Sequence, residues 1–158
     1  MLRSIFVAVL VVHSVEARPA HKNALAQYFG PFLPRKLNDC RTCHLPDKPG
    51  TAVTDPDYEK PHNAFGARLK KVKDELRQGG QKTTIESRLD AILDEDADGD
   101  GVSNLLEILS GHNPGEKDDR PTASELADAE KLFVLFTKFR KSYPWRPFEA
   151  VQRPALPT

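Results

Sequence analysis

The two cysteines of this 158-residue chain stand only three positions apart, at Cys40 and Cys43. A disulfide framework that joins distant parts of the chain is therefore excluded. A chain of this length has room for one domain with extensions, and a large catalytic core is not expected. The fold must be held by its apolar core and by whatever its polar clusters bind.

The N-terminus has the three parts of a secretory signal peptide. Arg3 precedes the apolar run 5–12, and small residues suited to cleavage follow, ending at Ala17. We expect residues 1–17 to be removed and the mature chain to be periplasmic or secreted. The apolar run is shorter than the roughly 20 residues of a membrane span. We therefore expect no transmembrane anchor after cleavage, with an uncleaved anchor as the alternative.

The cysteines belong to the segment Cys40-Arg41-Thr42-Cys43-His44. Two thiols at this spacing can bond one edge of a porphyrin, and the adjacent His44 then reaches the iron. Apocytochromes are exported before their haem is attached, so the motif and the signal peptide agree. We predict covalent haem c at Cys40 and Cys43, with His44 as the proximal iron ligand.

Two other uses of these residues stay open. A thioredoxin-like redox pair would sit at a helix start within a βαβ pattern, and no strand is predicted before Cys40. A zinc ion could take Cys40, Cys43, His44 and another histidine, but structural zinc sites more often pair two such motifs. Both alternatives are weaker than haem.

The second axial ligand of the iron is less constrained by the sequence. The only methionine is Met1, which leaves with the signal peptide, so methionine ligation is not expected. The candidates are His62, His112 and His21, or an open position. We favour His62, because it follows a loop long enough to round the haem edge. Two histidines would favour electron transfer, whereas an open position would permit ligand sensing or peroxide chemistry.

A second motif lies in the acidic segment 96–107, which fits the pattern D-x-D-x-D-G-x₅-E. Oxygen ligands at this spacing indicate Ca²⁺, and the pattern uses carboxylates, one backbone carbonyl and a final bidentate glutamate. No second loop of this type is present, so a single structural site is expected. The alternative is an acidic, solvated turn before a helix. The predicted ligands are Asp96, Asp98, Asp100, the carbonyl of Val102, Asn104 and Glu107.

The remaining pattern is helical, and the predicted fold class is mainly α. Apolar residues recur at three- and four-residue spacing in several segments, and strand signals are scarce. We expect residues 18–120 to form the haem and calcium-loop domain, 121–141 a C-terminal helix and 142–158 an extended Pro-containing tail. The predicted helices cover residues 22–29, 64–78, 84–92, 105–110 and 124–141, with caps at Asn63, at Thr83 together with Glu86, and at Ser124. The inner side of the last helix is predicted to carry Leu126, Phe133, Phe136 and Phe139 or the stem of Arg140.

The order of these motifs resembles a family of small exported bacterial c-type cytochrome-like proteins. The likeness covers about residues 38–120 and combines the Cys-x-x-Cys-His motif, His62-Asn63-Ala64-Phe65-Gly66 and a thrombospondin type 3-like calcium loop. Gly111-His112-Asn113-Pro114 replaces the more usual Gly-Thr-Asp-Pro ending. The resemblance implies a helical haem-binding unit whose C-terminal part is held by calcium. The tail from Trp145 is similar to segments that lead into further domains of larger cytochrome assemblies.

Charge and composition limit the function further. Lys and Arg number 23, and Asp and Glu number 23, so the formal net charge is zero and nucleic acid is not an expected partner. No nucleophile, base and orienting acid assemble in sequence, so an enzyme is not expected. We predict an electron carrier that meets a redox partner protein or a larger cytochrome assembly. The alternative is a calcium-dependent protein-interaction module.

Overall fold

The computed structural model describes residues 20–46 and 60–142. Within these ranges the chain forms five α-helices and three short 3₁₀ turns, and no strand occurs there, which confirms the mainly α fold. The predicted signal peptide 1–17, most of the loop after Leu45 and the tail beyond Ser142 lie outside the described residues. None of the described helices is long and apolar enough to cross a membrane.

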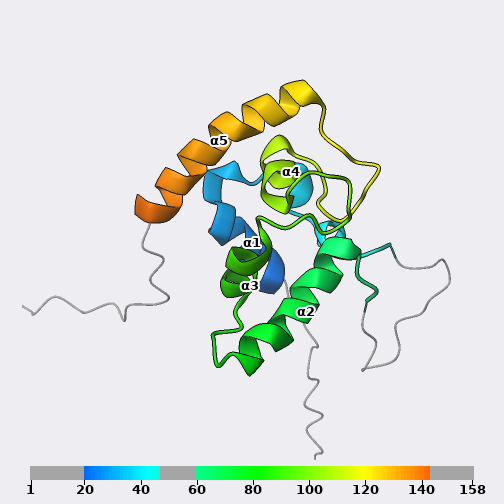
Figure 1. Cartoon of the computed structure of the whole chain (residues 1–158), viewed down its shortest axis with the longest axis vertical. Helices are drawn as coiled ribbons and strands as arrows, with labels where there is room; N and C mark the ends of the chain where they lie inside the picture. Colours follow the sequence, from blue (N-terminus) through cyan, green and yellow to red (C-terminus); the bar gives the residue numbers. More distant parts are fainter. Residues whose placement is uncertain (1–19, 47–59, 143–158) are drawn as a thin grey trace, which may run out of the picture.

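The helices lie close to their predicted positions (Figure 1). The last predicted helix continues one residue further than expected, through Ser142. The α-helices are α1 (Ala20–Phe29), α2 (Ala64–Gln78), α3 (Ile85–Ile92), α4 (Asn104–Ser110) and α5 (Ala123–Ser142). The 3₁₀ turns are η1 (Gly30–Phe32), η2 (Arg35–Leu37) and η3 (Cys40–Thr42).

Helix α2 follows directly from its sequence. Asn63 adopts an extended conformation, and its side chain accepts a hydrogen bond from the Gly66 N–H, which satisfies one of the unpaired donors of the first turn. Phe65, Leu69 and Val72 are buried on one side, as their spacing predicts. This stripe faces α3 and places the start of α2 beside the cysteine motif.

Two of the predicted caps are wrong by one or two residues. The cap of α3 is Thr84, whose hydroxyl accepts from the Ser87 N–H, and not Thr83 with Glu86. The carbonyl of Thr83 instead accepts from Arg88 Nε at 2.9 Å. The reciprocal capping pattern occurs at α5, where Thr122 and Glu125 bond each other's backbone N–H, so Ser124 lies inside the helix.

Helix α5 lies along one side of the molecule, across α4 and the segment after α1 (Figure 1). Its anchor is Phe136, whose ring stacks on Phe29 with centroids 5.3 Å apart and meets Phe32 edge-on at 5.7 Å. Phe133 was predicted to face inward, but 42% of its surface is exposed. The actual inner row follows Ala129 and Phe136, which are seven positions apart and therefore share one side of the helix.

Candidate functional site

The cysteine motif forms a tight turn that depends on three local hydrogen bonds. The side chain of Asp39 caps η3 by accepting from the Arg41 N–H at 2.9 Å. The hydroxyl of Thr42 donates to the carbonyl of Leu37 at 2.6 Å, and the His44 N–H donates to the carbonyl of Cys40 at 2.9 Å. Both thiols are free, with Cys40 exposed and Cys43 partly buried. The turn therefore brings two thiols and an imidazole to one short stretch of surface.

The two thiols differ in their chemistry. Burial, together with the nearby Cys40, raises the pKa of Cys43 to about 12. Cys43 is therefore a neutral thiol at physiological pH, whereas the Cys40 thiol is open to solvent. Reagents in solution should reach Cys40 first.

The ring of His44 is held in an orientation that suits a metal ligand. Its Nδ1 lies 3.3 Å from the carbonyl oxygen of Lys60. A carbonyl oxygen accepts hydrogen bonds and does not donate them, so Nδ1 is the donor in this contact and Nε2 is the ring nitrogen left to bind a metal. Histidines that bind metals usually direct the other ring N–H to a carbonyl or carboxylate in this way. The donor set of the motif therefore fits haem c.

His62, the favoured second axial ligand, lies beside His44. The two residues form an isolated antiparallel bridge, and their ring centroids are 4.5 Å apart with planes inclined at 33°. A porphyrin between the two rings would need more space than this. Ligation of one iron from opposite faces therefore requires the His62 ring to turn away from His44, and the axial role of His62 stays a prediction.

The other two candidate histidines have different surroundings. His21, at the start of α1, has its pKa lowered by burial and by the nearby charges of Arg88, His44 and Lys73. It is thus a second imidazole near His44. His112 lies between two carboxylates, with Nδ1 2.8 Å from Asp119 and Nε2 3.5 Å from Glu125. Both ring nitrogens of His112 therefore already have carboxylate partners, and these hold the ring in the turn after α4.

Two asparagine side chains hold the backbone of the cysteine turn. The amide nitrogen of Asn63 donates to the carbonyls of Arg41 and Thr42 at 3.2 and 3.1 Å. The amide nitrogen of Asn113 reaches the same Arg41 carbonyl at 3.2 Å, and its oxygen lies 3.4 Å from the Asn63 amide nitrogen. The sequence interpretation recognised Asn63 as a helix cap only and gave Asn113 no role, because their partners lie 21 to 72 positions away.

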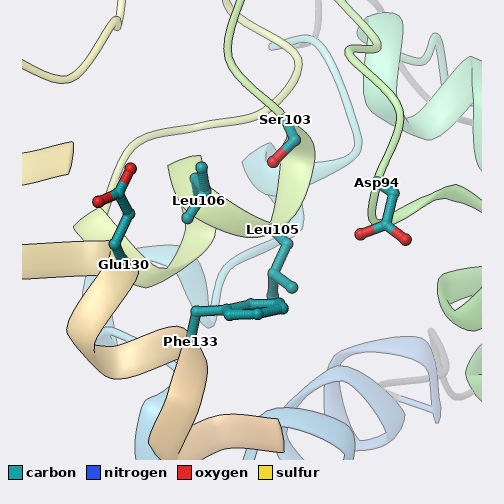
Figure 2. A pocket seen from close by; sticks show the side chains of 6 residues that line it. All are labelled: Asp94, Ser103, Leu105, Leu106, Glu130 and Phe133. Atoms are coloured by element: carbon teal, nitrogen blue, oxygen red, sulfur yellow. The ribbon is translucent and has the colours of Figure 1, made fainter. Parts of the chain in front are cut away.

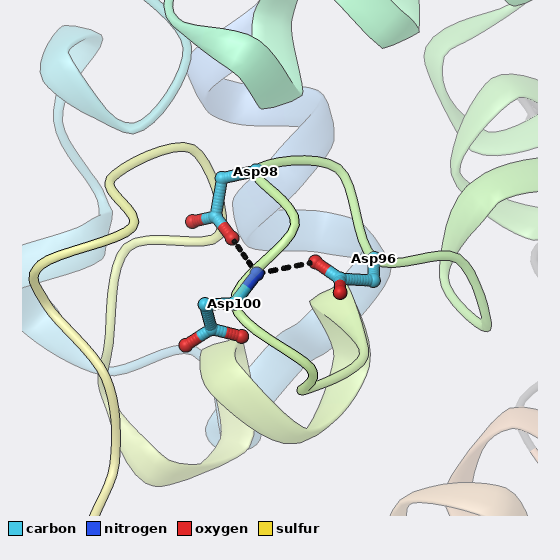
Figure 3. Close-up of side chains that lie close together, drawn as sticks. All are labelled: Asp96, Asp98 and Asp100. Atoms are coloured by element: carbon cyan, nitrogen blue, oxygen red, sulfur yellow. Dashed lines mark hydrogen bonds between the residues drawn. The ribbon is translucent and has the colours of Figure 1, made fainter.

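The acidic loop gathers its carboxylates as predicted (Figure 3). Asp96, Asp98 and Asp100 each place one oxygen within 4.8 Å of the others. The loop turns around these side chains, because Asp96 accepts from the N–H groups of Gly99 and Gly101 at 2.8 Å. Gly101 has φ 96°, a left-handed conformation that favours glycine. The pattern thus encodes both the turn and the cluster.

Several carboxylate oxygens of this cluster are buried without a hydrogen-bond donor. They are both oxygens of Glu107, Oδ2 of Asp98 and Oδ2 of Asp100. Glu107 is fully buried, and the Asp100 side chain is 2% exposed, with Nε of Arg120 3.7 Å from its Oδ2. Burial and the charges of Asp98, Asp100, Asp96 and Asp119 raise the pKa of Glu107 to about 9. Buried acceptors of this kind destabilise the fold unless they are protonated or paired with a cation, and an oxygen-only donor set fits Ca²⁺.

Asn104 has a second role that the sequence pattern did not reveal. Its side-chain oxygen accepts from the Ala97 N–H at 3.1 Å, and its amide nitrogen donates to the Ile92 carbonyl at 2.6 Å. The side chain therefore ties the end of α3 to the start of α4. Val102 is buried, and its N–H donates to Asp100 at 2.7 Å. Cation ligation by the Asn104 oxygen and the Val102 carbonyl stays a prediction.

A separate cavity of about 260 Å³ lies between α4 and α5 (Figure 2). Leu105, Leu106 and Phe133 give it apolar walls, and Asp94 and Glu130 stand at its edge. Neither the cysteines nor the histidines line it. The cavity is therefore distinct from the cysteine motif.

Comparison with known proteins adds no family assignment. No protein-family model, curated protein or solved structure matches the chain.

Proposed function

We propose that the chain is an exported haem c protein that transfers electrons and whose C-terminal part is held by one calcium ion. The observation that carries the haem assignment is the orientation of His44, whose Nδ1 faces the carbonyl of Lys60 directly after a turn with two free thiols. Bound haem would supply a one-electron redox centre. The residues of this chain would attach it through Cys40 and Cys43 and hold its iron through His44.

Calcium is supported by the unpartnered oxygens of Glu107, Asp98 and Asp100. A cation among them would offset the cost of burying several like charges. The consequence would be a fixed connection between α3 and α4, which no disulfide provides in this chain. The predicted periplasmic or secreted location suits both the thioether bonds and a calcium site.

The test of haem attachment is the absorption spectrum of the chain produced in a host that exports it and attaches haem c. We expect haem bands that persist after denaturation and solvent extraction, because thioether bonds are covalent. The double variant Cys40→Ser/Cys43→Ser is the control and should lose them. A wild-type chain without extraction-resistant haem would contradict the proposal.

The second axial ligand is tested by replacing His62, His21 and His112 one at a time by alanine. We expect only His62→Ala to convert the ferrous spectrum from low spin to high spin. His112→Ala is the matched control, because Asp119 and Glu125 already hold its ring. A high-spin wild-type spectrum would contradict bis-histidine ligation and favour ligand or peroxide chemistry.

A calcium-dependent interaction module is the second candidate function. The observation that favours it is the exposed apolar run Phe133, Val134 and Leu135 on α5, which are 42%, 52% and 51% exposed. Large apolar side chains left exposed close together often mark a contact with another protein. Absence of haem together with calcium binding would favour this function.

A further inference from the structure

The acidic loop and the cysteine turn are connected by a short, continuous set of hydrogen bonds. The first step is α4, whose seven residues carry Glu107 in the first turn and end at Gly111. Such a helix is only about 10 Å long and moves as one piece. The carbonyl of Glu107 accepts from the His112 N–H at 2.7 Å. Glu107, whose carboxylate has no hydrogen-bond donor, therefore also holds the backbone that follows α4.

The second step is the turn 111–119. Gly111 has φ 89°, which reverses the chain direction after α4. Asp119 then accepts from the Asn113 N–H at 2.9 Å and pairs with the ring of His112 at 2.8 Å. Asn113 is 7% exposed and its side-chain nitrogen also donates to Glu116 at 2.7 Å. This turn therefore holds the Asn113 side chain in one orientation.

The third step is the contact with the cysteine turn. Asn113 donates to the Arg41 carbonyl, and Asn63 donates to the carbonyls of Arg41 and Thr42. A Cβ at Gly115 would overlap the Asn63 side chain, so the turn after α4 packs directly on Asn63. The backbone between the two cysteines is thus held jointly from α2 and from the turn after α4.

We propose that a divalent cation in the acidic loop controls the order and accessibility of the segment 40–44, and that Asn113 is the positioning residue that transmits this control. Without the cation, the buried Glu107 carboxyl has no partner and the three aspartates of the loop repel one another, so α4 and the turn after it open more often. Opening removes the Asn113 bond from the Arg41 carbonyl and uncovers Cys43. With the cation, the turn stays closed and both thiols are held at a fixed spacing.

This inference rests on the proposed calcium site but not on haem, so it is tested on the chain produced without haem attachment. Iodoacetamide modification of each cysteine is followed by mass spectrometry, in about 10 mM calcium or in chelator. We expect calcium to slow modification of Cys43 on the order of tenfold, because it suppresses local opening. The exposed Cys40 should change by less than about twofold.

Variants at Asn113 test whether this residue transmits the effect of the cation to the cysteine turn. Asn113→Ala removes every side-chain bond, and Asn113→Asp keeps the acceptor oxygen but removes the donors to Arg41 and Glu116. Terbium luminescence reports whether each variant still binds a cation in the loop, and circular dichroism reports whether it folds. We expect both variants to bind terbium while calcium protects their Cys43 by no more than about twofold. Asp118→Ala, an exposed position in the same turn, is the control and should behave as the parent.

The outcomes separate the two claims. Terbium binding with no effect of calcium on Cys43 overturns the coupling and leaves the calcium site standing. Full calcium protection in both Asn113 variants overturns the role of Asn113. Absence of terbium and calcium binding to the parent chain overturns both the calcium site and the coupling. Extraction-resistant haem is measured separately and bears only on the haem assignment.

Discussion

Glu107 combines a place in the first turn of α4 with a fully buried carboxylate that has no hydrogen-bond donor to either oxygen. Four nearby aspartates add repulsion to the cost of desolvation, and burial with these charges raises its pKa to about 9. A glutamate in this position destabilises the fold unless it is protonated or bound to a cation.

The raised pKa of Glu107 predicts how stability depends on pH in the absence of calcium. Below about pH 4.5 this carboxyl is protonated in both the folded and the unfolded chain. Between there and about pH 9, the unfolded chain releases the proton while the folded chain keeps it, so stability falls as pH rises. We expect the melting temperature in chelator to decrease across this range.

Calcium and a matched variant provide the control for this pH dependence. In saturating calcium the carboxylate is ionised and bound, so the decrease should become smaller. Glu107→Gln carries no titrating proton, and it should be less sensitive to pH and no longer respond to calcium. Parallel pH curves for wild type with and without calcium would contradict the assignment of Glu107 as a ligand.

Gly66 is a second residue whose role depends on close packing. It lies in the first turn of α2 with ordinary helical geometry, but a Cβ there would overlap the carbonyl oxygen of Cys43 and lie 2.9 Å from His62. We predict that Gly66→Ala destabilises the chain by about 1–3 kcal/mol, because the cysteine turn must move. Gly79→Ala, where the nearest atom is 3.5 Å away, should change stability by no more than about 0.5 kcal/mol. Denaturant unfolding measures both, and equal effects would contradict this packing argument.

At the scale of elements, Phe136 packs α5 against α1 and η1. Phe136 contacts Phe29, Phe32 and Tyr28, and it is 4% exposed. We predict that Phe136→Ala costs about 3–5 kcal/mol of unfolding free energy. Its neighbour Leu135 is 51% exposed, and Leu135→Ala should cost no more than about 0.5 kcal/mol. Denaturant unfolding measures the free energy of unfolding of both variants. Equal decreases would contradict the burial of Phe136 and the exposure of Leu135, and so the described orientation of α5.

The extent of the helices could be predicted from sequence because local signals agree there. Asn63, the apolar stripe of α2 and Gly79 give a cap, a period and an end. The caps of α3 and α5 were misplaced because residues one or two positions apart offer equivalent hydroxyls: Thr83 and Thr84 before α3, and Thr122 and Ser124 at α5. Packing decides between them. Phe133 was misplaced for a similar reason, since several apolar residues in α5 compete for one buried side.

At the scale of the whole molecule, the motifs were predictable but their connection was not. The spacing of Asp96, Asp98 and Asp100 correctly predicted a carboxylate cluster, because the acidic residues of this loop are close in sequence. The bond from Asn113 to the Arg41 carbonyl spans 72 positions and involves a backbone atom. Because the acceptor is a backbone carbonyl, the type of residue at position 41 does not indicate the contact. Sequence patterns therefore identify sites more readily than the contacts that couple them.

The whole molecule should be stabilised by calcium. Single sites of this kind in exported proteins bind with a dissociation constant on the order of 10⁻⁴–10⁻³ M, so about 10 mM calcium adds about 1.4–2.7 kcal/mol of unfolding free energy. We expect one unfolding transition that shifts upward with calcium when it is followed by circular dichroism. Magnesium should give a smaller shift, because it requires a tighter octahedral geometry. Asp98→Asn removes one carboxylate charge from the cluster and should reduce the calcium-dependent shift of the melting temperature. If the melting temperature of the parent chain is the same with and without chelator, the calcium site is contradicted.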